Sequence, residues 1–299
     1  MSQFQRLFLV ASPEMKRTPA FERAVALAAA TGAVLNVGMF VFSETIDALG
    51  HVDHSKMLEA RDEYLAGHEA WLNEQVAPAR ERGVRINCLV EWSKHPVGDI
   101  LGHVQAMPAE LLIKDVHPEP AIERAIATPL DLQLVGLSPV PVHLVTDARH
   151  AVPQKVVAAV DPLIRVARVT EFNDRIVEAA KCLARQCQAE LHLLDVSSAK
   201  VDQPFSTVTL NLPWLGELEQ KMKAASREAF DLLARRHGVP DERHHFLMGS
   251  PAQRIAEFVK RIEGDVVVMG SSSREALGST IELLLYRMPG SVLIVHPQD

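Results

Sequence analysis

The chain has 299 residues, 47% of them hydrophobic and 23% charged, and its formal net charge is −7. This length predicts about two domains, and the composition is that of an ordinary globular protein. Nucleic acid is not an expected partner, because neither half is basic and the nearest approach to a basic cluster, Arg80-Glu81-Arg82 with Arg85, contains an acid. No signal peptide is visible and no stretch reaches the roughly 20 apolar residues that span a bilayer, so we expect a cytoplasmic protein with no membrane partner.

The three cysteines, Cys88, Cys182 and Cys187, include no CxxC pair. Such sparse usage predicts reduced thiols in a reducing compartment. Cys182 and Cys187 are expected to be small buried apolar residues on different faces of one helix.

The first half alternates predicted strands and helices. Short runs rich in Val, Leu and Ala are typical of strands buried on both faces of a parallel sheet. A helix is predicted from Pro19 to Ala30, because Thr18 is a good N-cap and Gly32 a good stop signal. The other expected elements are strands at 7–12, 34–40, 84–90, 110–115 and 138–145, a long helix at 56–82 closed by Gly83, a helix after Pro96 and a last helix before the final strand.

The second half repeats this order. Equivalent positions lie 149 or 150 residues apart, as in Leu7 and Val156 or Val145 and Val295. The repeat predicts an α/β protein with two tandem doubly wound five-stranded parallel-sheet domains, at 1–147 and 154–299. The expected elements are strands at 156–161, 190–196, 243–248, 265–270 and 288–295, and helices at 174–185, 215–237, after Pro251 and at 281–288.

Ligands of open α/β sheets bind at the carboxyl ends of the strands, and the second half offers candidates there. A carboxylate such as Asp161 can bind a ribose hydroxyl or a base edge. A glycine at a strand end lets the backbone approach a phosphate. Two local explanations need no ligand: Asp161-Pro162 is a common turn opening, and Ser279-Thr280-Ile281-Glu282 is a capping box. The candidate nucleotide-binding residues are Asp161, Val196, Gly270, Ser271, Gly278, Ser279 and Thr280.

The duplicated motifs resemble the universal stress protein family, and their tandem order resembles its two-domain E-type members. The resemblance covers nearly the whole chain. In the second half it rests on Val156 to Asp161, Leu191 to Val196, Gly249-Ser250-Pro251 to Ile255, Asp265 to Gly270, Gly278-Ser279-Thr280 and Pro289 to Val295. In the first half it rests on Trp92 to Pro96, Leu111 to Lys114, Thr128 to Asp131 and Pro139 to Val142.

ATP-binding members of this family carry an acid after the first strand and a G-x2-G-x9-G-[ST] loop after the fourth. In the second half Ser273 stands where the second glycine belongs, and four residues separate it from Gly278 instead of nine. The resemblance therefore leaves ATP or AMP as a ligand of this half only, with a loop too short to follow the usual path around a triphosphate. In the first half Ser12 replaces the acid and Thr128-Pro129 replaces the G-[ST] pair, so ATP binding in the family manner is not expected there.

Histidines supply weaker candidates. His51 and His54 flank Asp53 at a spacing that could hold a metal, but no third ligand is near, so we expect a solvated loop and no metal site. His244 and His245 alternate on a predicted strand, so at most one should face inward. If the first half has a repurposed pocket, its expected polar lining is Lys114, His117 and His95.

The sequence thus favours a non-enzymatic stress-response or regulatory protein with no firmly assigned cofactor. The alternatives are an ATP-binding protein with slow ATP hydrolysis in the second half, or a small-molecule pocket in the first. The family resemblance implies that Val140 to Val145 and Val292 to Val295 pair edge to edge, which makes the chain an internal pseudo-dimer. Two such chains can further associate as a homodimer.

Overall fold

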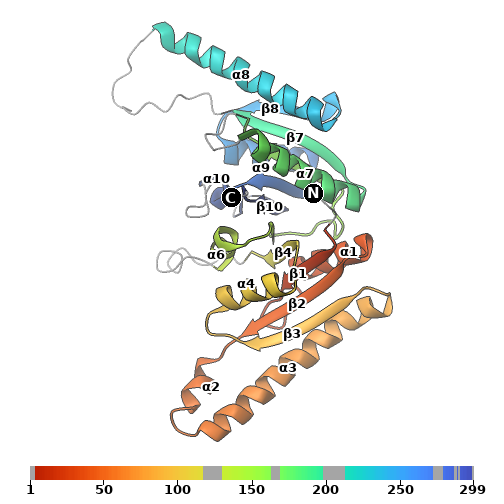
Figure 1. The fold of residues 1–299 in the computed structure, drawn as a ribbon, viewed down its shortest axis with the longest axis vertical. Coiled ribbons are helices and arrows are strands. Elements are labelled where there is room, and N and C mark those ends of the chain that lie inside the picture. Colours follow the sequence, from red (N-terminus) through yellow and green to blue (C-terminus); the bar gives the residue numbers. More distant parts are fainter. Residues whose placement is uncertain are drawn as a thin grey trace. The chain divides into compact units, whose positions relative to one another are not determined.

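The computed structural model describes residues 4–116, 130–162, 169–197, 213–271, 279–285, 288 and 290–297. The chain divides into two compact units, with the division between Val152 and Pro153. Each unit, called here the first half and the second half, is described by itself (Figure 1).

The first half is a five-stranded parallel sheet in the order β3-β2-β1-β4-β5. Leu7 at its centre pairs with Leu35 on one side and Leu111 on the other. Right-handed crossovers place α1 and α3 on one face and α4 and α6 on the other. The strands are β1 (Arg6–Val10), β2 (Val34–Val41), β3 (Ile86–Trp92), β4 (Leu111–Asp115) and β5 (Val142–Val145); the helices are α1 (Pro19–Thr31), α2 (Glu44–Leu49), α3 (His54–Glu81), α4 (Pro96–Ala106) and α6 (Leu130–Leu137).

The second half repeats this topology in the order β8-β7-β6-β9-β10, again with parallel pairing throughout. Here α7 and α8 cover one face, and α9 and α10 cover the other. The strands are β6 (Lys155–Val160), β7 (Glu190–Ser197), β8 (His244–Met248), β9 (Val266–Gly270) and β10 (Ser291–Val295); the helices are α7 (Val169–Cys187), α8 (Pro213–His237), a short 3-10 turn η1 (Asp241–Arg243), α9 (Pro251–Ile262) and α10 (Ser279–Leu285). The expected fold class, two doubly wound five-stranded parallel sheets in tandem, is confirmed.

Local sequence signals explain where several helices begin and end. The Thr18 hydroxyl accepts a hydrogen bond from the Phe21 amide at the start of α1, and Gly32 ends that helix with a φ of 68°. Asp53 caps α3, because its carboxylate accepts from the Lys56 amide at 3.1 Å. His51 and Val52 form an exposed turn, as expected, and His54 is exposed as well but already begins α3. The short helix α2, capped by Ser43, was not predicted.

The final strand of the first half is shorter than predicted. The predicted strand at 138–145 is only Val142–Val145 in the structure. Pro139 and Pro141 have no amide to donate, and the Ser138 hydroxyl forms a turn by bonding the amide and the carbonyl of Val140. The pairing of β5 with β10 stays a prediction.

Buried side chains fill both halves. The large ones that are almost fully buried include Phe8, Phe21, Phe230 and Phe258. Cys182 is buried as expected, whereas Cys187 is only half-buried; none of the three cysteines forms a disulfide. Among the described residues, no helix has both the length and the apolar character to cross a membrane.

Candidate functional site

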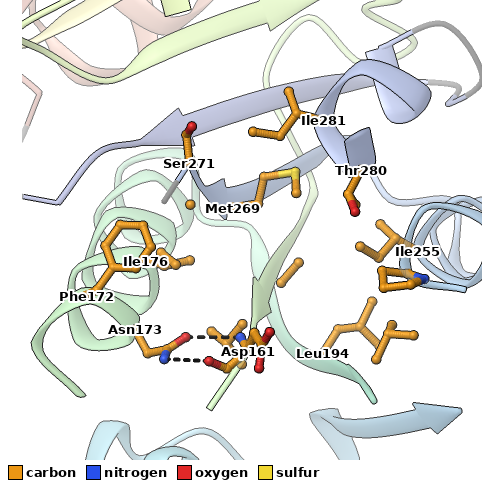
Figure 2. A pocket seen from close by; sticks show the side chains of 15 residues that line it. Asp161, Phe172, Asn173, Ile176, Leu194, Ile255, Met269, Ser271, Thr280 and Ile281 are labelled. Carbon is orange, nitrogen blue, oxygen red and sulfur yellow. Dashed lines mark hydrogen bonds between the residues drawn. The ribbon is translucent and has the colours of Figure 1, made fainter. Parts of the chain in front are cut away.

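A pocket of about 200 Å³ lies at the carboxyl edge of the second-half sheet, where β6, β7 and β9 end (Figure 2). Helix α7 contributes its wall on one face of the sheet, and α9 and α10 contribute to it on the other. Its lining residues are Ala159, Val160, Asp161, Phe172, Asn173, Ile176, Leu194, Val196, Pro251, Ile255, Met269, Gly270, Ser271, Thr280 and Ile281.

Asp161 is held in place by Asn173, one turn into α7. The Asn173 amide nitrogen donates to the Asp161 carbonyl at 2.9 Å, and its amide oxygen accepts from the Asp161 backbone N–H at 3.1 Å. Figure 2 shows both bonds. Asn173 is buried, so this pair satisfies backbone groups at the point where β6 ends. The carboxylate-bearing residue is itself exposed and lines the mouth of the pocket.

Gly270 is tightly packed, at the end of β9. A Cβ atom added there would lie 2.3 Å from Cζ of Phe172 and 2.8 Å from Cδ1 of Ile176. The sequence suggested that this glycine lets the backbone approach a phosphate. In the structure the space beside it holds the Phe172 ring, and packing alone requires a glycine.

The described lining is mostly apolar, with four polar side chains: Asp161, Asn173, Ser271 and Thr280. Within this described lining there is no basic side chain. The carboxylate can accept hydrogen bonds, and the two hydroxyls can donate or accept them. The pocket is thus suited to an uncharged, flat or aliphatic ligand whose hydroxyl or amino groups donate hydrogen bonds to the carboxylate.

A second carboxyl group lies behind this pocket. Asp195 on β7 pairs in register with Val160, and its side chain is buried on the α8 side of the sheet, where it accepts a hydrogen bond from the Ser226 hydroxyl at 3.0 Å. Burial raises the pKa of Asp195 to about 7, and the charge of Asp161 raises it as well, while the Ser226 bond lowers it. The ionisation of Asp195 is therefore coupled to the carboxylate at the pocket mouth.

Five of the seven nucleotide-binding candidates line this one pocket: Asp161, Val196, Gly270, Ser271 and Thr280. Ser279 begins α10, and its side chain, like the whole of Gly278, lies outside the described residues. Three residues that shape the site were missed, namely Phe172, Asn173 and Asp195. The helix at α7 was predicted to begin at Asp174, which left the first two of them out.

The first-half candidates do not gather in the same way. Lys114 is buried on β4, where its ammonium lies 2.7 Å from the Asp131 carboxylate of α6 and donates to the Asp115 carbonyl at 2.9 Å. His95 is exposed, immediately before α4. His117 lies outside the described residues.

Replacing Lys114 with methionine is expected to destabilise the first half by about 3 kcal/mol, the lower end for breaking a buried pair, since Met keeps the apolar stem. Urea unfolding measures the loss. Lys56→Met is the matched control, because that lysine is 73% exposed. The double change Lys114→Met with Asp131→Leu should recover much of the loss. A single variant no less stable than Lys56→Met would contradict a structural role for the pair.

Both strand histidines of β8 are largely covered, so the expectation that at most one faces inward is wrong. His244 packs against α8, with its Nε2 2.7 Å from the Val239 carbonyl. His245 faces α9, with its Nε2 3.1 Å from Nδ1 of His192 and its ring 4.4 Å from that of Phe258. The two sides of the strand are covered by different helices. No cluster of His, Cys, Asp and Glu that could hold a metal occurs among the described residues.

Comparison with known proteins identifies the fold unit. The profile of the Universal stress protein family matches residues 6–146 and again 154–296. The chain belongs to the universal stress protein family. It carries two universal stress protein units in tandem, as the duplicated motifs indicated.

Two curated relatives match this chain over nearly their whole length. Universal stress protein E of Photorhabdus laumondii is 24% identical over 306 residues, which cover 99% of this chain and 96% of the relative. A Universal stress protein E homolog of Haemophilus influenzae is 21% identical over 99% of this chain and 98% of its own. The resemblance to E-type members is thereby confirmed.

Solved structures show the same fold. A putative universal stress protein from Pseudomonas aeruginosa has a TM-score of 0.73 at 23% identity, over 98% of this chain and 94% of its own. A universal stress protein from Archaeoglobus fulgidus has a TM-score of 0.66 at 17% identity, over 99% and 98% of the two chains.

Proposed function

We propose that this chain is a non-enzymatic stress-response protein that regulates by binding, and that the Asp161 pocket of its second half takes a nucleoside or nucleotide. The observation that carries the proposal is the position of Asp161. It places a carboxylate at the mouth of a mostly apolar pocket at the carboxyl edge of the sheet. A flat base can pack against the apolar wall, while ribose hydroxyls or an amino group donate to the carboxylate.

The described lining supports the nucleoside part of such a ligand more directly than its phosphates. Asp161 is negative, and the described lining offers no basic side chain to offset a triphosphate. The segment between Gly270 and Gly278 is also shorter than in the ATP-binding pattern. We therefore expect adenosine or AMP to bind more tightly than ATP. Cytoplasmic localisation, and an internal pseudo-dimer in which the last strands of the two halves pair, are parts of the same proposal.

Isothermal titration with adenosine, AMP, ADP and ATP tests the proposal. Asp161→Ala is expected to weaken binding by about tenfold or more, the loss expected for hydrogen bonds to a charged group. Asp241→Ala is the matched control, because that side chain is fully exposed on η1 and does not line the pocket. Native mass spectrometry of freshly purified protein would show any ligand carried through purification.

Two results would overturn the proposal. The absence of heat with all four ligands, together with no carried-over mass, would remove ligand binding. Release of phosphate from ATP that Asp161→Ala abolishes and Asp241→Ala leaves intact would instead establish the alternative, slow ATP hydrolysis in the second half.

A further inference from the structure

The edge strand β8 presents unpaired backbone groups on its outer side. Within the described residues of the second half, β7 is its only strand partner. The Gly249 amide donates to the Ser197 carbonyl at 3.2 Å, so residues 245, 247 and 249 bond toward β7. In a parallel ladder the alternate residues, His244, Phe246 and Met248, direct their N–H and C=O groups outward.

Two of these outward groups already have partners. The His244 amide donates to the Asp241 carbonyl, and the Met248 carbonyl accepts from Nε of Arg254 at 3.0 Å. The N–H and C=O of Phe246 lie between them, with no hydrogen-bond partner among the described residues. The edge is thus closed at both ends and open at its centre.

The matching edge of the first half is covered differently. There Arg80 of α3 lies along the outer side of β3, where its Nε donates to the Ile86 carbonyl at 3.1 Å and its guanidinium reaches Cys88. The long helix therefore shields that edge from further pairing.

A groove of about 570 Å³ runs beside the open part of β8, between residues 246–248 and helix α9. The α9 side is lined by Arg254, Glu257, Phe258 and Arg261. An added strand at this edge would lie with alternate side chains directed into the groove.

The charge of the groove favours an acidic occupant. Glu257 is already engaged, since its carboxylate accepts from Arg254 at 2.9 Å and from Gln253 at 2.8 Å. Arg261 is exposed and lies over the Phe258 ring, with 5.2 Å from its Cζ to the ring centroid. Among the described residues Arg261 has no acidic partner, so the groove carries a net positive charge.

We propose that the β8 edge binds an extended acidic peptide, which adds to the sheet as a further strand. The Phe246 backbone supplies the central hydrogen bonds of the new ladder. An apolar side chain of the peptide packs against Leu247, which lines the groove and is only partly buried, and an acidic one reaches the guanidinium of Arg261. This interaction is independent of the Asp161 pocket, which lies at the carboxyl ends of the central strands.

Fluorescence anisotropy with the full chain tests the proposal. The probes are a blocked, labelled peptide in which valine and aspartate take turns at every second position, with threonine between them, and the same peptide with lysine in place of aspartate. The acidic probe should bind and the basic one should not. Arg261→Glu should weaken the acidic probe by about tenfold or more, as expected for the loss of a charge-assisted contact and its replacement by repulsion. Arg235→Glu makes the same charge change at an exposed position of α8 outside this groove and should leave binding unchanged.

Hydrogen exchange distinguishes strand addition from electrostatic attraction alone, because only strand addition protects backbone amides of β8. With the acidic probe bound, the Phe246 and Met248 amides should exchange more slowly, while the Leu247 amide, already bonded toward β7, should change little. The proposal is overturned if the acidic probe does not bind, if the two arginine variants behave alike, or if protection appears elsewhere. Self-association that Arg261→Glu abolishes would assign the edge to a second copy of the chain instead.

Discussion

Valine in place of Gly270 is expected to destabilise the second half by about 4 kcal/mol, above the usual range for an overpacked core. The new Cβ would lie 2.3 Å from the Phe172 ring and 2.8 Å from Ile176, both on the buried face of α7. Neither neighbour can move without disturbing the contact between that helix and β9. Hydrogen exchange of the β9 amides in rising urea measures the loss in this half alone.

A control and a partner variant separate packing from ligand binding. Gly102→Ala should be neutral or stabilising by up to about 1 kcal/mol, because Gly102 lies within α4 with no atom close to its missing Cβ. Removing the ring in Phe172→Ala should reduce the loss of stability caused by Gly270→Val. The double variant should then be more stable than the summed free-energy changes of the two single variants predict. Full stability of Gly270→Val with loss of nucleotide binding would instead show that the glycine serves a ligand.

Asparagine in place of Asp195 is expected to stabilise the protein by about 4 kcal/mol at pH 8 and to change little at pH 3, since a three-unit pKa shift corresponds to that energy. Burial raises the pKa of Asp195 from 3.8 to about 7. The folded state therefore holds the proton more tightly than the unfolded state. The stability that this group contributes is complete below pH 3.8 and is lost as the pH rises through about 7.

The measurement is the difference in unfolding free energy between the variant and the parent across this pH range. That difference cancels the opposite effect of His245, whose pKa is lowered by burial to about 4 and which costs stability as the pH falls from 6.5 toward 4. Asp241→Asn, at a fully exposed side chain, is the control and should give no pH-dependent difference. A difference for Asp195→Asn that is the same at both pH values would contradict the buried, proton-binding carboxyl.

The strands could be predicted because their uninterrupted apolar runs indicate buried parallel strands without reference to the rest of the chain. Runs such as Val156 to Val160 and Val266 to Met269 are buried on both faces, and only a central parallel strand needs an uninterrupted apolar run. The start of α1 was equally predictable, because Thr18 and Pro19 act through local bonds. Element ends that depend on non-local contacts were placed less well, as in the start of α7, where Phe172 contacts Gly270 and Asn173 bonds the Asp161 backbone.

The site was predictable only at its strand ends. Asp161 and Gly270 follow apolar runs, so their place at the carboxyl edge could be inferred from topology. Phe172 and Asn173 carried no such signal. Phe172 packs on Gly270, which is distant in the sequence. Asn173 bonds the Asp161 backbone, and it belongs to a part of α7 that was not predicted to be helical. Asp195 was passed over because it alternates away from the pocket, onto the α8 face of β7.

The packing of the Phe172 ring on Gly270 also affects how well a glycine after the fourth strand predicts ATP binding in related chains. A glycine that a neighbouring aromatic side chain demands will persist under selection for folding, whether or not any ligand is bound. Its presence after the fourth strand is therefore weak grounds for grouping a chain with the ATP binders. The residue that packs on the glycine is the more informative one to inspect, since a small side chain there would leave the glycine accessible, whereas the phenylalanine fills the space beside it.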